Sequence, residues 1–145
     1  MEQNSFHKRR ILNKFVLTFK QYDVFIIVSA NKFTQLDKFL ATEVKKQQKH
    51  FYFVRTKIQQ TLDSKRKGRR DKTINEEEEM NKILEEIESN LQEMYNKENC
   101  FIIDSYELKK FEFNKMIEKI YCDLPANTRS ALAHVIQTGV QKFWK

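Results

Sequence analysis

The segment "FYFVRTKIQQ", residues 51–60, begins as an unbroken apolar run and ends in polar residues. A short run of aromatic and β-branched residues is typical of a strand buried within a sheet. "VFIIVSA" at 24–30 has the same character, and we expect it to be a strand buried on both faces, as in parallel sheets covered by helices. With "CFIID" at 100–104, the sequence predicts three strands: 24–30, 51–56 and 100–104.

Helical periodicity fills the intervals around these strands. Apolar residues recur at helical spacing in the segments 5–20, 34–48, 75–96, 113–124 and 127–143. Asn75, followed by Glu78, has the spacing of a capping box at the start of one of these helices. Strands that alternate with helices indicate a three-layer α/β fold around a parallel sheet with right-handed crossovers. Because sheets usually have four to six strands, we expect further strands to be missing from this chain.

The composition limits the classes of function. The 145 residues carry 27 Lys and Arg against 20 Asp and Glu, for a net charge of +7, which permits binding to nucleic acid or to an anionic membrane. The basic segment 64–72 is expected to be a solvated surface loop. No aromatic residue between 61 and 72 offers a platform for base stacking. Nucleic-acid binding through Lys65 to Arg70 is therefore the weakest of the functions considered.

Reactive and targeting features are few. Cys100 and Cys122 lie in apolar segments and are expected to be reduced core thiols of a cytosolic protein. His7, His50 and His134 are far apart in the sequence, so no metal site is expected. No apolar stretch approaches the roughly 20 residues of a membrane-spanning helix. The N-terminus "MEQNSFHKRR" has neither a signal-peptide core nor the glycine needed for N-myristoylation.

The scarcity of glycine excludes the common phosphate-binding motifs. The chain has only two glycines, Gly68 and Gly139. GxxxxGK[ST] needs two glycines five positions apart, and GxGxxG needs three close together. A DxxG motif also fails, because Lys65 and Ile136 stand three residues before the two glycines. This chain therefore has no phosphate-binding apparatus of these kinds.

Three stretches resemble one family: "YDVFIIVSANKF" (22–33), "FYFVRTKI" (51–58) and "FEFNKMIEKIYCDLP" (111–125). In order, spacing and wording, roughly residues 15–130 resemble the second half of the G domain of the immunity-related GTPases, which are interferon-inducible, dynamin-like defence GTPases of vertebrates. The resemblance implies the last three strands of a six-stranded, Ras-like P-loop GTPase sheet. Residues 1–125 would be a partial G domain lacking the P-loop and switch regions, and residues 126–145 a C-terminal helix that starts a truncated helical domain.

The resemblance assigns four residues to degenerate loops that contact the guanine base. Thr56 and Lys57 match the start of the family's TKxD motif, in which the lysine stem lies against the purine ring. Gln59 occupies the position of the base-selecting aspartate, and Ser105 matches the serine of the second base-contacting loop. A carboxylate accepts from both guanine N1–H and the 2-amino group, whereas a glutamine amide leaves one guanine N–H facing a donor, at a cost of about 1–3 kcal/mol. Asp63 lies four residues too late to substitute by position.

The resemblance implies a GTPase of interferon-inducible innate defence that uses GTP or GDP with Mg²⁺. The groups that hold phosphate and Mg²⁺ and orient water are not in this chain. We therefore expect a pseudo-GTPase without catalytic residues or a metal site, in which Mg²⁺ binds only together with the missing half. The alternative is a non-enzymatic module that pairs with a full-length GTPase of the family through the G domain. We expect the chain to be cytoplasmic and peripheral on intracellular membranes, and not to bind nucleic acid.

Overall fold

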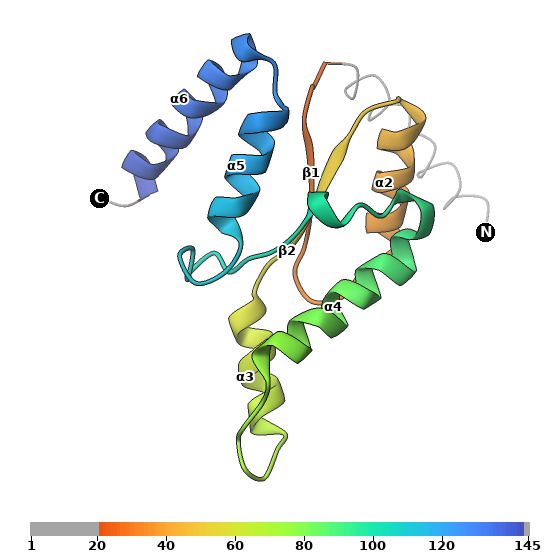
Figure 1. Cartoon of the computed structure of the whole chain (residues 1–145), viewed down its shortest axis with the longest axis vertical. Helices are drawn as coiled ribbons and strands as arrows, with labels where there is room; N and C mark the ends of the chain where they lie inside the picture. Colours follow the sequence, from red (N-terminus) through yellow and green to blue (C-terminus); the bar gives the residue numbers. More distant parts are fainter. Residues whose placement is uncertain (1–20, 144–145) are drawn as a thin grey trace, which may run out of the picture.

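A parallel sheet of three strands forms the centre of the molecule (Figure 1). The computed structural model describes the backbone of residues 21–143 and the side chains of residues 21–138. The strands stand in the order β1 (Phe25–Ser29), β2 (Phe51–Arg55) and β3 (Cys100–Ile102). The helices are α2 (Gln35–Lys46), α3 (Ile58–Lys67), α4 (Glu76–Leu91), α5 (Phe113–Asp123) and α6 (Ala126–Phe143). The predicted α/β fold is confirmed, while the helix predicted at 5–20 lies outside the described residues.

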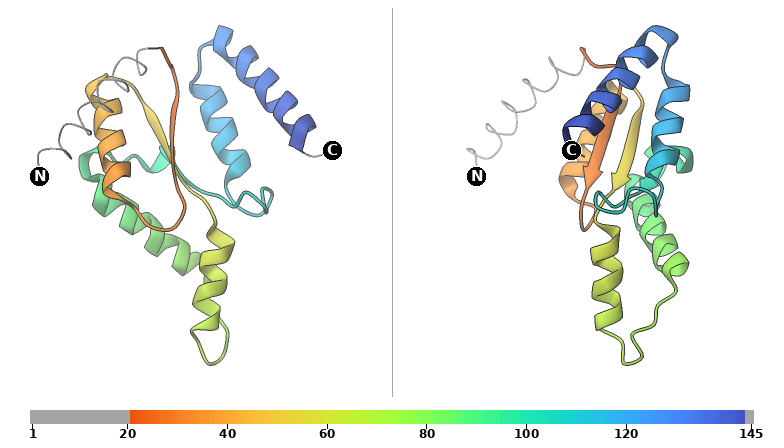
Figure 2. Two further views of the ribbon diagram at one scale, coloured as in Figure 1. Left: turned by 180° about the vertical axis from the view of Figure 1, so that it is seen from behind. Right: turned by 90° about the vertical axis from the view of Figure 1, so that its left-hand side faces the viewer.

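The central strand β2 has helices on both of its faces. Phe51 and Phe53 pack on one face against residues of α2 and α4. Tyr52 and Val54 pack on the opposite face against residues of α5. In the right-hand view of Figure 2 the strands run between α2 on one side and α5 on the other. All five residues of β2 are therefore buried, as the sequence predicts.

The edge strand β1 is buried on one face only, so the prediction of burial on both faces is wrong for residues 24–30. Ile27 and Ser29 are buried on the face that α2 covers. Ile26 and Val28, on the other face, are 46% and 58% exposed, because α5 packs over β2 and β3. Within residues 21–143, the outer edge of β1 pairs with no strand. An apolar run identified the strand but could not show whether both faces are covered.

Short polar side chains fix the starts of two helices. The Thr34 hydroxyl accepts from the Asp37 backbone N–H at 3.2 Å, and the Asp37 carboxylate accepts from the Thr34 N–H at 2.8 Å. This pair is a complete capping box for α2. Asn75 Oδ1 accepts from the Glu78 N–H at 3.2 Å, which confirms the predicted start of α4. Two 3₁₀ turns then lead from α4 to β3: Gln92–Met94 and Lys97–Asn99.

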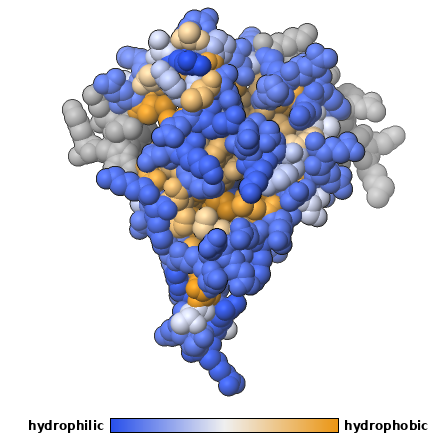
Figure 3. All heavy atoms as spheres, in the orientation of Figure 1, coloured by the Kyte–Doolittle hydropathy of each residue, from blue (hydrophilic) through white to orange (hydrophobic). Residues whose placement is uncertain are grey.

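The helix α3 takes up part of the segment 64–72, which was predicted to be a loop. Ile58 and Leu62 stand four residues apart, are fully buried, and pack with Ile102 of β3. Two apolar positions make too short a stripe to predict a helix from periodicity. α3 and the loop after it project away from the sheet, and this end of the molecule has a mostly hydrophilic surface (Figure 3).

Candidate functional site

The carboxyl ends of the three strands lie side by side, where open α/β sheets bind their ligands. We call this end of the sheet the carboxyl edge, and the opposite end, where the strands begin, the amino edge. The connections that leave this edge span residues 30–34, 56–57 and 103–112. A cleft of about 530 Å³ lies between α3 and the loop after β3. Its lining includes Lys57, Gln59, Asp63, Asp104 and Tyr106. Two of the four residues that the sequence assigned to a site therefore line one cleft.

The connection between β2 and α3 consists of two residues, Thr56 and Lys57. The Thr56 N–H donates to the Ser29 carbonyl at 2.9 Å, so the pairing with β1 continues one residue beyond the strand. Lys57 has a φ of 58°, in the left-handed region that residues with a side chain rarely adopt. This conformation turns the chain from strand to helix at a single residue. The Lys57 side chain is exposed, and its ammonium makes no hydrogen bond or ion pair with the residues that the structure describes.

The connection after β3 approaches Thr56 from a distant part of the sequence. Ser105 Oγ lies 3.2 Å from Thr56 Oγ1, within hydrogen-bond distance. The Ile103 N–H donates to the Arg55 carbonyl at 2.8 Å, which extends the pairing of β3 with β2 up to this point. Both loops thus start from paired backbone, and the sheet itself brings the two hydroxyls together.

Asp104 joins the two loops and was not singled out from the sequence. Its side chain is buried; Oδ2 accepts from the Gln59 N–H at 3.0 Å and Oδ1 accepts from the Tyr106 N–H at 2.9 Å. Lys57, at the N-cap position of α3, makes no capping hydrogen bond, so Asp104 caps this helix from a different loop. Side-chain caps contribute about 0.5–2 kcal/mol to stability. The one signal in the sequence was an aspartate directly after the apolar run "CFII".

Both polar atoms of the Gln59 side-chain amide form hydrogen bonds. Its Nε2 donates to Asp63 Oδ1 at 3.0 Å, and its Oε1 accepts from Lys110 Nζ at 2.7 Å. Asp63, one helical turn later, also accepts from Arg66 Nη1 at 3.0 Å. The carboxylate nearest to Gln59 along α3 is therefore Asp63, which lines the same cleft.

A buried guanidinium lies behind the loops. Arg55, the last residue of β2, is 2% exposed, and its Nη2 lies 3.4 Å from Glu86 Oε1 on α4. The same oxygen accepts from the Phe33 N–H at 3.2 Å, in the connection after β1. Glu86 therefore links the first connection to the strand that carries the second. Nothing in the sequence pattern predicted this link, because it depends on α4 crossing the end of β2.

The amino edge of the sheet has a cleft of its own, of about 540 Å³, lined in part by His50, Tyr52 and Asp123. Tyr52 donates its hydroxyl hydrogen to Asp123 Oδ2 at 2.6 Å, and Lys119 Nζ donates to Asp123 Oδ1 at 2.9 Å. Burial, together with the hydrogen bond and charge of Asp123, raises the pKa of Tyr52 well above its usual range. Burial alone would raise the pKa of Asp123, but the hydrogen bonds from Tyr52 and Lys119 outweigh it and lower that pKa.

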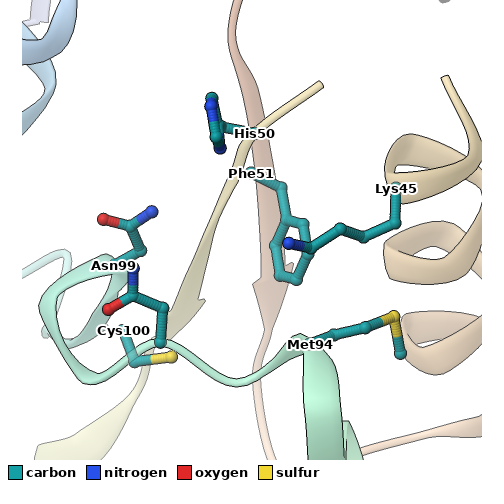
Figure 4. Close-up of a pocket in the computed structure, with 7 residues that line it drawn as sticks. Lys45, His50, Phe51, Met94, Asn99 and Cys100 are labelled. Atoms are coloured by element: carbon teal, nitrogen blue, oxygen red, sulfur yellow. The ribbon is translucent and has the colours of Figure 1, made fainter. Parts of the chain in front are cut away.

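A small cavity of about 40 Å³ lies at the same edge, between α2 and the chain before β3. Figure 4 shows Lys45, His50, Phe51, Met94, Asn99 and Cys100 around it. Burial raises the pKa of Cys100 to about 12, so this thiol stays protonated and behaves as a core side chain. Cys122 is exposed, so its predicted place in the core is wrong.

The charged end of α3 is partly neutralised by the acidic start of α4. Lys65 Nζ and Arg69 Nη2 lie 3.6 Å and 3.8 Å from the Glu79 carboxylate, and Arg66 pairs with Glu76.

Within the described part of the chain, His, Cys, Asp and Glu side chains form no cluster of three or more suited to a metal ion. Likewise, none of the helices in that part combines the length and apolar character needed to cross a bilayer.

Comparison with known proteins places the chain in a family. Residues 4–143 match the sequence model of the family described as "Interferon-inducible GTPase (IIGP)". T-cell-specific guanine nucleotide triphosphate-binding protein 2 of Mus musculus is 35% identical over 128 residues, which are 88% of this chain and 30% of that protein. Interferon-gamma-inducible GTPase 10 of Mus musculus is 32% identical, with 84% of this chain and 29% of that protein covered.

Interferon-inducible GTPase 1 of Mus musculus is 28% identical over 78% of this chain and 27% of its own length. The chain therefore spans less than a third of the length of these three relatives. The match to the family model covers nearly all of the chain. From this match, and from a parallel sheet with the loops that the sequence predicts, the chain belongs to the interferon-inducible GTPase family, the immunity-related GTPases.

Proposed function

We propose that this chain is the base-binding part of a guanine-nucleotide-binding G domain. The observation that carries the proposal is the meeting of Thr56 and Ser105 at the carboxyl edge of the sheet, 3.2 Å apart, with Lys57 exposed beside them. A purine ring placed on the aliphatic stem of Lys57 would leave its ammonium in solvent. The names of the relatives, which include a guanine nucleotide triphosphate-binding protein, support guanine as the base.

The side chain of Gln59 weakens this base site without removing it. Its single acceptor, Oε1, already binds Lys110. To meet guanine, the amide would have to release Lys110, and it would still leave one guanine N–H without an acceptor, at about 1–3 kcal/mol. We infer a site that binds guanine weakly and discriminates it poorly from adenine.

Hydrolysis of GTP needs groups that these 145 residues do not include. The two glycines, Gly68 and Gly139, rule out a P-loop within this sequence. Phosphoryl transfer depends almost wholly on positioned charges around the phosphates, above all a lysine and Mg²⁺. We therefore infer that these residues alone do not hydrolyse GTP and do not hold Mg²⁺. Joined to a phosphate-binding half, they would supply the base side of the site.

A titration by nuclear magnetic resonance tests the base site. With GMP added to the ¹⁵N-labelled chain, we expect saturable shifts at the amides of Thr56, Lys57 and Ser105, with a dissociation constant of roughly a millimolar or weaker. Lys57→Ala should abolish them. Lys67→Ala, which removes a second lysine of the same cleft, is the matched control and should leave them unchanged. Shifts spread evenly over the basic residues, or an equal loss of the GMP-induced shifts in both variants, would contradict the base-site proposal.

A second candidate function is an interaction module, and the exposed face of β1 favours it. Ile26 and Val28 are 46% and 58% exposed beside a strand edge that no described strand pairs with. Such an edge is a template for association with another chain. The partner we infer is a GTPase of the same family. Sedimentation should show concentration-dependent association that Val28→Lys removes, whereas Leu36→Lys, at an exposed position on α2, should not affect it.

We also infer that the chain is cytoplasmic and contacts intracellular membranes peripherally. The net charge of +7 supports this, because basic proteins are attracted to the anionic cytoplasmic leaflet. Flotation with vesicles containing phosphatidylserine should recover the chain at low salt and lose it at high salt. Equal recovery with neutral vesicles would contradict an electrostatic contact.

A further inference from the structure

We propose that Asp104 is a positioning residue, which holds the two base-contacting loops in the arrangement that reads a purine. The proposal rests on the base-binding function inferred above. One carboxylate oxygen accepts from the Gln59 N–H, in the first turn of α3, and the other accepts from the Tyr106 N–H, in the loop after β3. Lys57 stands two residues before Gln59, and Ser105 stands one residue before Tyr106, so Asp104 fixes the two relative to each other.

Asp104 is the strongest of the contacts that cross between these two loops. The Thr56–Ser105 hydroxyl pair and the Lys110–Gln59 contact are both exposed, and solvent competes with contacts of that kind. Asp104 is only 4% exposed and forms two charge-assisted hydrogen bonds to backbone amides, of which the one to the Gln59 N–H crosses to α3 and the one to the Tyr106 N–H stays within its own loop. Backbone partners cannot rotate away as side chains can, so the bonds fix the path of both loops.

The first turn of α3 needs this outside partner. Lys57 at the N-cap contributes no side-chain hydrogen bond and has a left-handed backbone. The carboxylate of Asp104 meets a free N–H at the positive end of the helix dipole, where negative charge is favourable. Without it, the first turn would fray and Lys57 would lose its fixed direction. A purine would then bind only with the added cost of ordering the loops.

Hydrogen exchange of single amides tests the positioning directly in the full 145-residue chain. We expect Asp104→Ala to speed exchange of both the Gln59 and the Tyr106 amides by about tenfold or more. Asp104→Asn keeps one acceptor and turns its NH₂ toward the other amide, so one of the two amides should be released. Asp63→Asn is the matched control, because Asp63 contacts the side chain of Gln59 and not its N–H.

The isosteric Asp104→Asn keeps the proposal testable if Asp104→Ala does not fold. Unchanged exchange at both amides in Asp104→Asn, or an equal effect of Asp63→Asn, would overturn the assignment. A general rise in exchange across β2 would also overturn it, since that would show a role in overall stability only.

GMP binding separates this proposal from the function on which it rests. If the wild-type chain binds GMP, Asp104→Asn should weaken binding by roughly tenfold while the exchange of the β2 amides stays unchanged. Unaltered GMP affinity despite released loop amides would overturn the positioning role. If the wild-type chain shows no GMP shifts at all, the base-binding function fails and the purine-reading role falls with it, while the amide exchange still reports whether Asp104 joins the loops.

Discussion

The sheet has a cleft at each edge, and the two are nearly equal in size, about 530 Å³ at the carboxyl edge and about 540 Å³ at the amino edge. Each is bordered by an aspartate that accepts two hydrogen bonds. Asp104, at the carboxyl edge, accepts from two backbone amides, one in the first turn of α3 and one in its own loop. Asp123, at the amino edge, accepts from the side chains of Tyr52 and Lys119. The two clefts therefore do not differ in size. They differ in the groups that their aspartates bind, which are backbone amides at the carboxyl edge and side chains at the amino edge.

Under the proposed function, this difference separates a surface that binds a ligand from one that supports packing. The bonds of Asp104 shape exposed loops that carry Thr56, Lys57 and Ser105. The bond from Tyr52 to Asp123 attaches the end of α5 to the central strand, and the bond from Lys119 lies within α5. We therefore expect changes at the amino edge to alter stability alone, and changes at the carboxyl edge to alter loop order and base binding as well.

The largest expected loss of stability comes from truncating a buried apolar side chain next to each cleft. Ile58→Ala, at a fully buried position directly after Lys57, should lower the free energy of unfolding by about 2–5 kcal/mol. Leu124→Ala, buried at the end of α5, should cost a similar amount. Urea denaturation measures both losses. Only Ile58→Ala should also broaden or shift the amide resonances of residues 56–59. The same changes in Leu124→Ala would contradict the expectation that the amino edge affects stability alone.

Removal of the Tyr52 hydroxyl at the amino edge should cause a smaller loss of stability. Tyr52→Phe removes the hydrogen bond to Asp123, and since Tyr52 is 4% exposed, we expect the free energy of unfolding to fall by about 1–3 kcal/mol. Tyr121→Phe is the control, because Tyr121 is exposed. Thermal unfolding compares the two variants. GMP binding should be the same in Tyr52→Phe as in wild type. A change in GMP affinity would show that the amino edge influences binding at the carboxyl edge, contrary to the account.

The hydroxyl pair at the carboxyl edge should contribute less. A double-mutant cycle of Thr56→Val with Ser105→Ala should give a coupling energy of about 0.5 kcal/mol, because the contact is exposed. Urea unfolding of the four proteins measures it. A coupling of several kcal/mol would mean that the loops depend on this pair, and Asp104 would then not be their main link.

The pH dependence of the amino edge has a definite sign. The folded pKa of Asp123 lies below its ordinary value, so its stabilising contribution is present above about pH 4 and is lost as the pH falls through the lowered folded pKa. The difference in unfolding free energy between wild type and Asp123→Asn should therefore be widest near neutral pH and should narrow in acid. A difference that widens below pH 4 would contradict the assigned hydrogen bonds.

Sequence patterns were enough to locate the strands and most of the helices. The apolar runs that contain β1, β2 and β3 alternate with helical segments, and this alternation favours a parallel sheet with helices between its strands. Patterns did not predict α3, because Ile58 and Leu62 alone face the core. Exposure of Ile26 and Val28 also escaped prediction, since a run of apolar residues does not show which neighbours cover it.

The place of the candidate site in the fold could be predicted from the sequence, whereas its buried support could not. Thr56 ends one predicted strand, and Lys57 and Ser105 follow directly after predicted strands, so a parallel sheet places all three at one edge. Asp104 bonds to an amide 45 residues away in the sequence, and such a contact depends on the final packing of two loops. The sequence thus indicates at which end of the sheet the candidate site lies, while the groups that hold its loops in shape require the structure.

Replacement of Gln59 by aspartate tests the central claim most directly. If the carboxyl edge is a guanine-base site weakened at this position, Gln59→Asp supplies two acceptors for guanine N1–H and the 2-amino group. GMP titration of the full chain should then show binding at least about tenfold tighter than in wild type, with AMP unaffected. Equal affinity of the two proteins for GMP, or an equal gain for AMP, would contradict a guanine-reading role for this edge of the sheet.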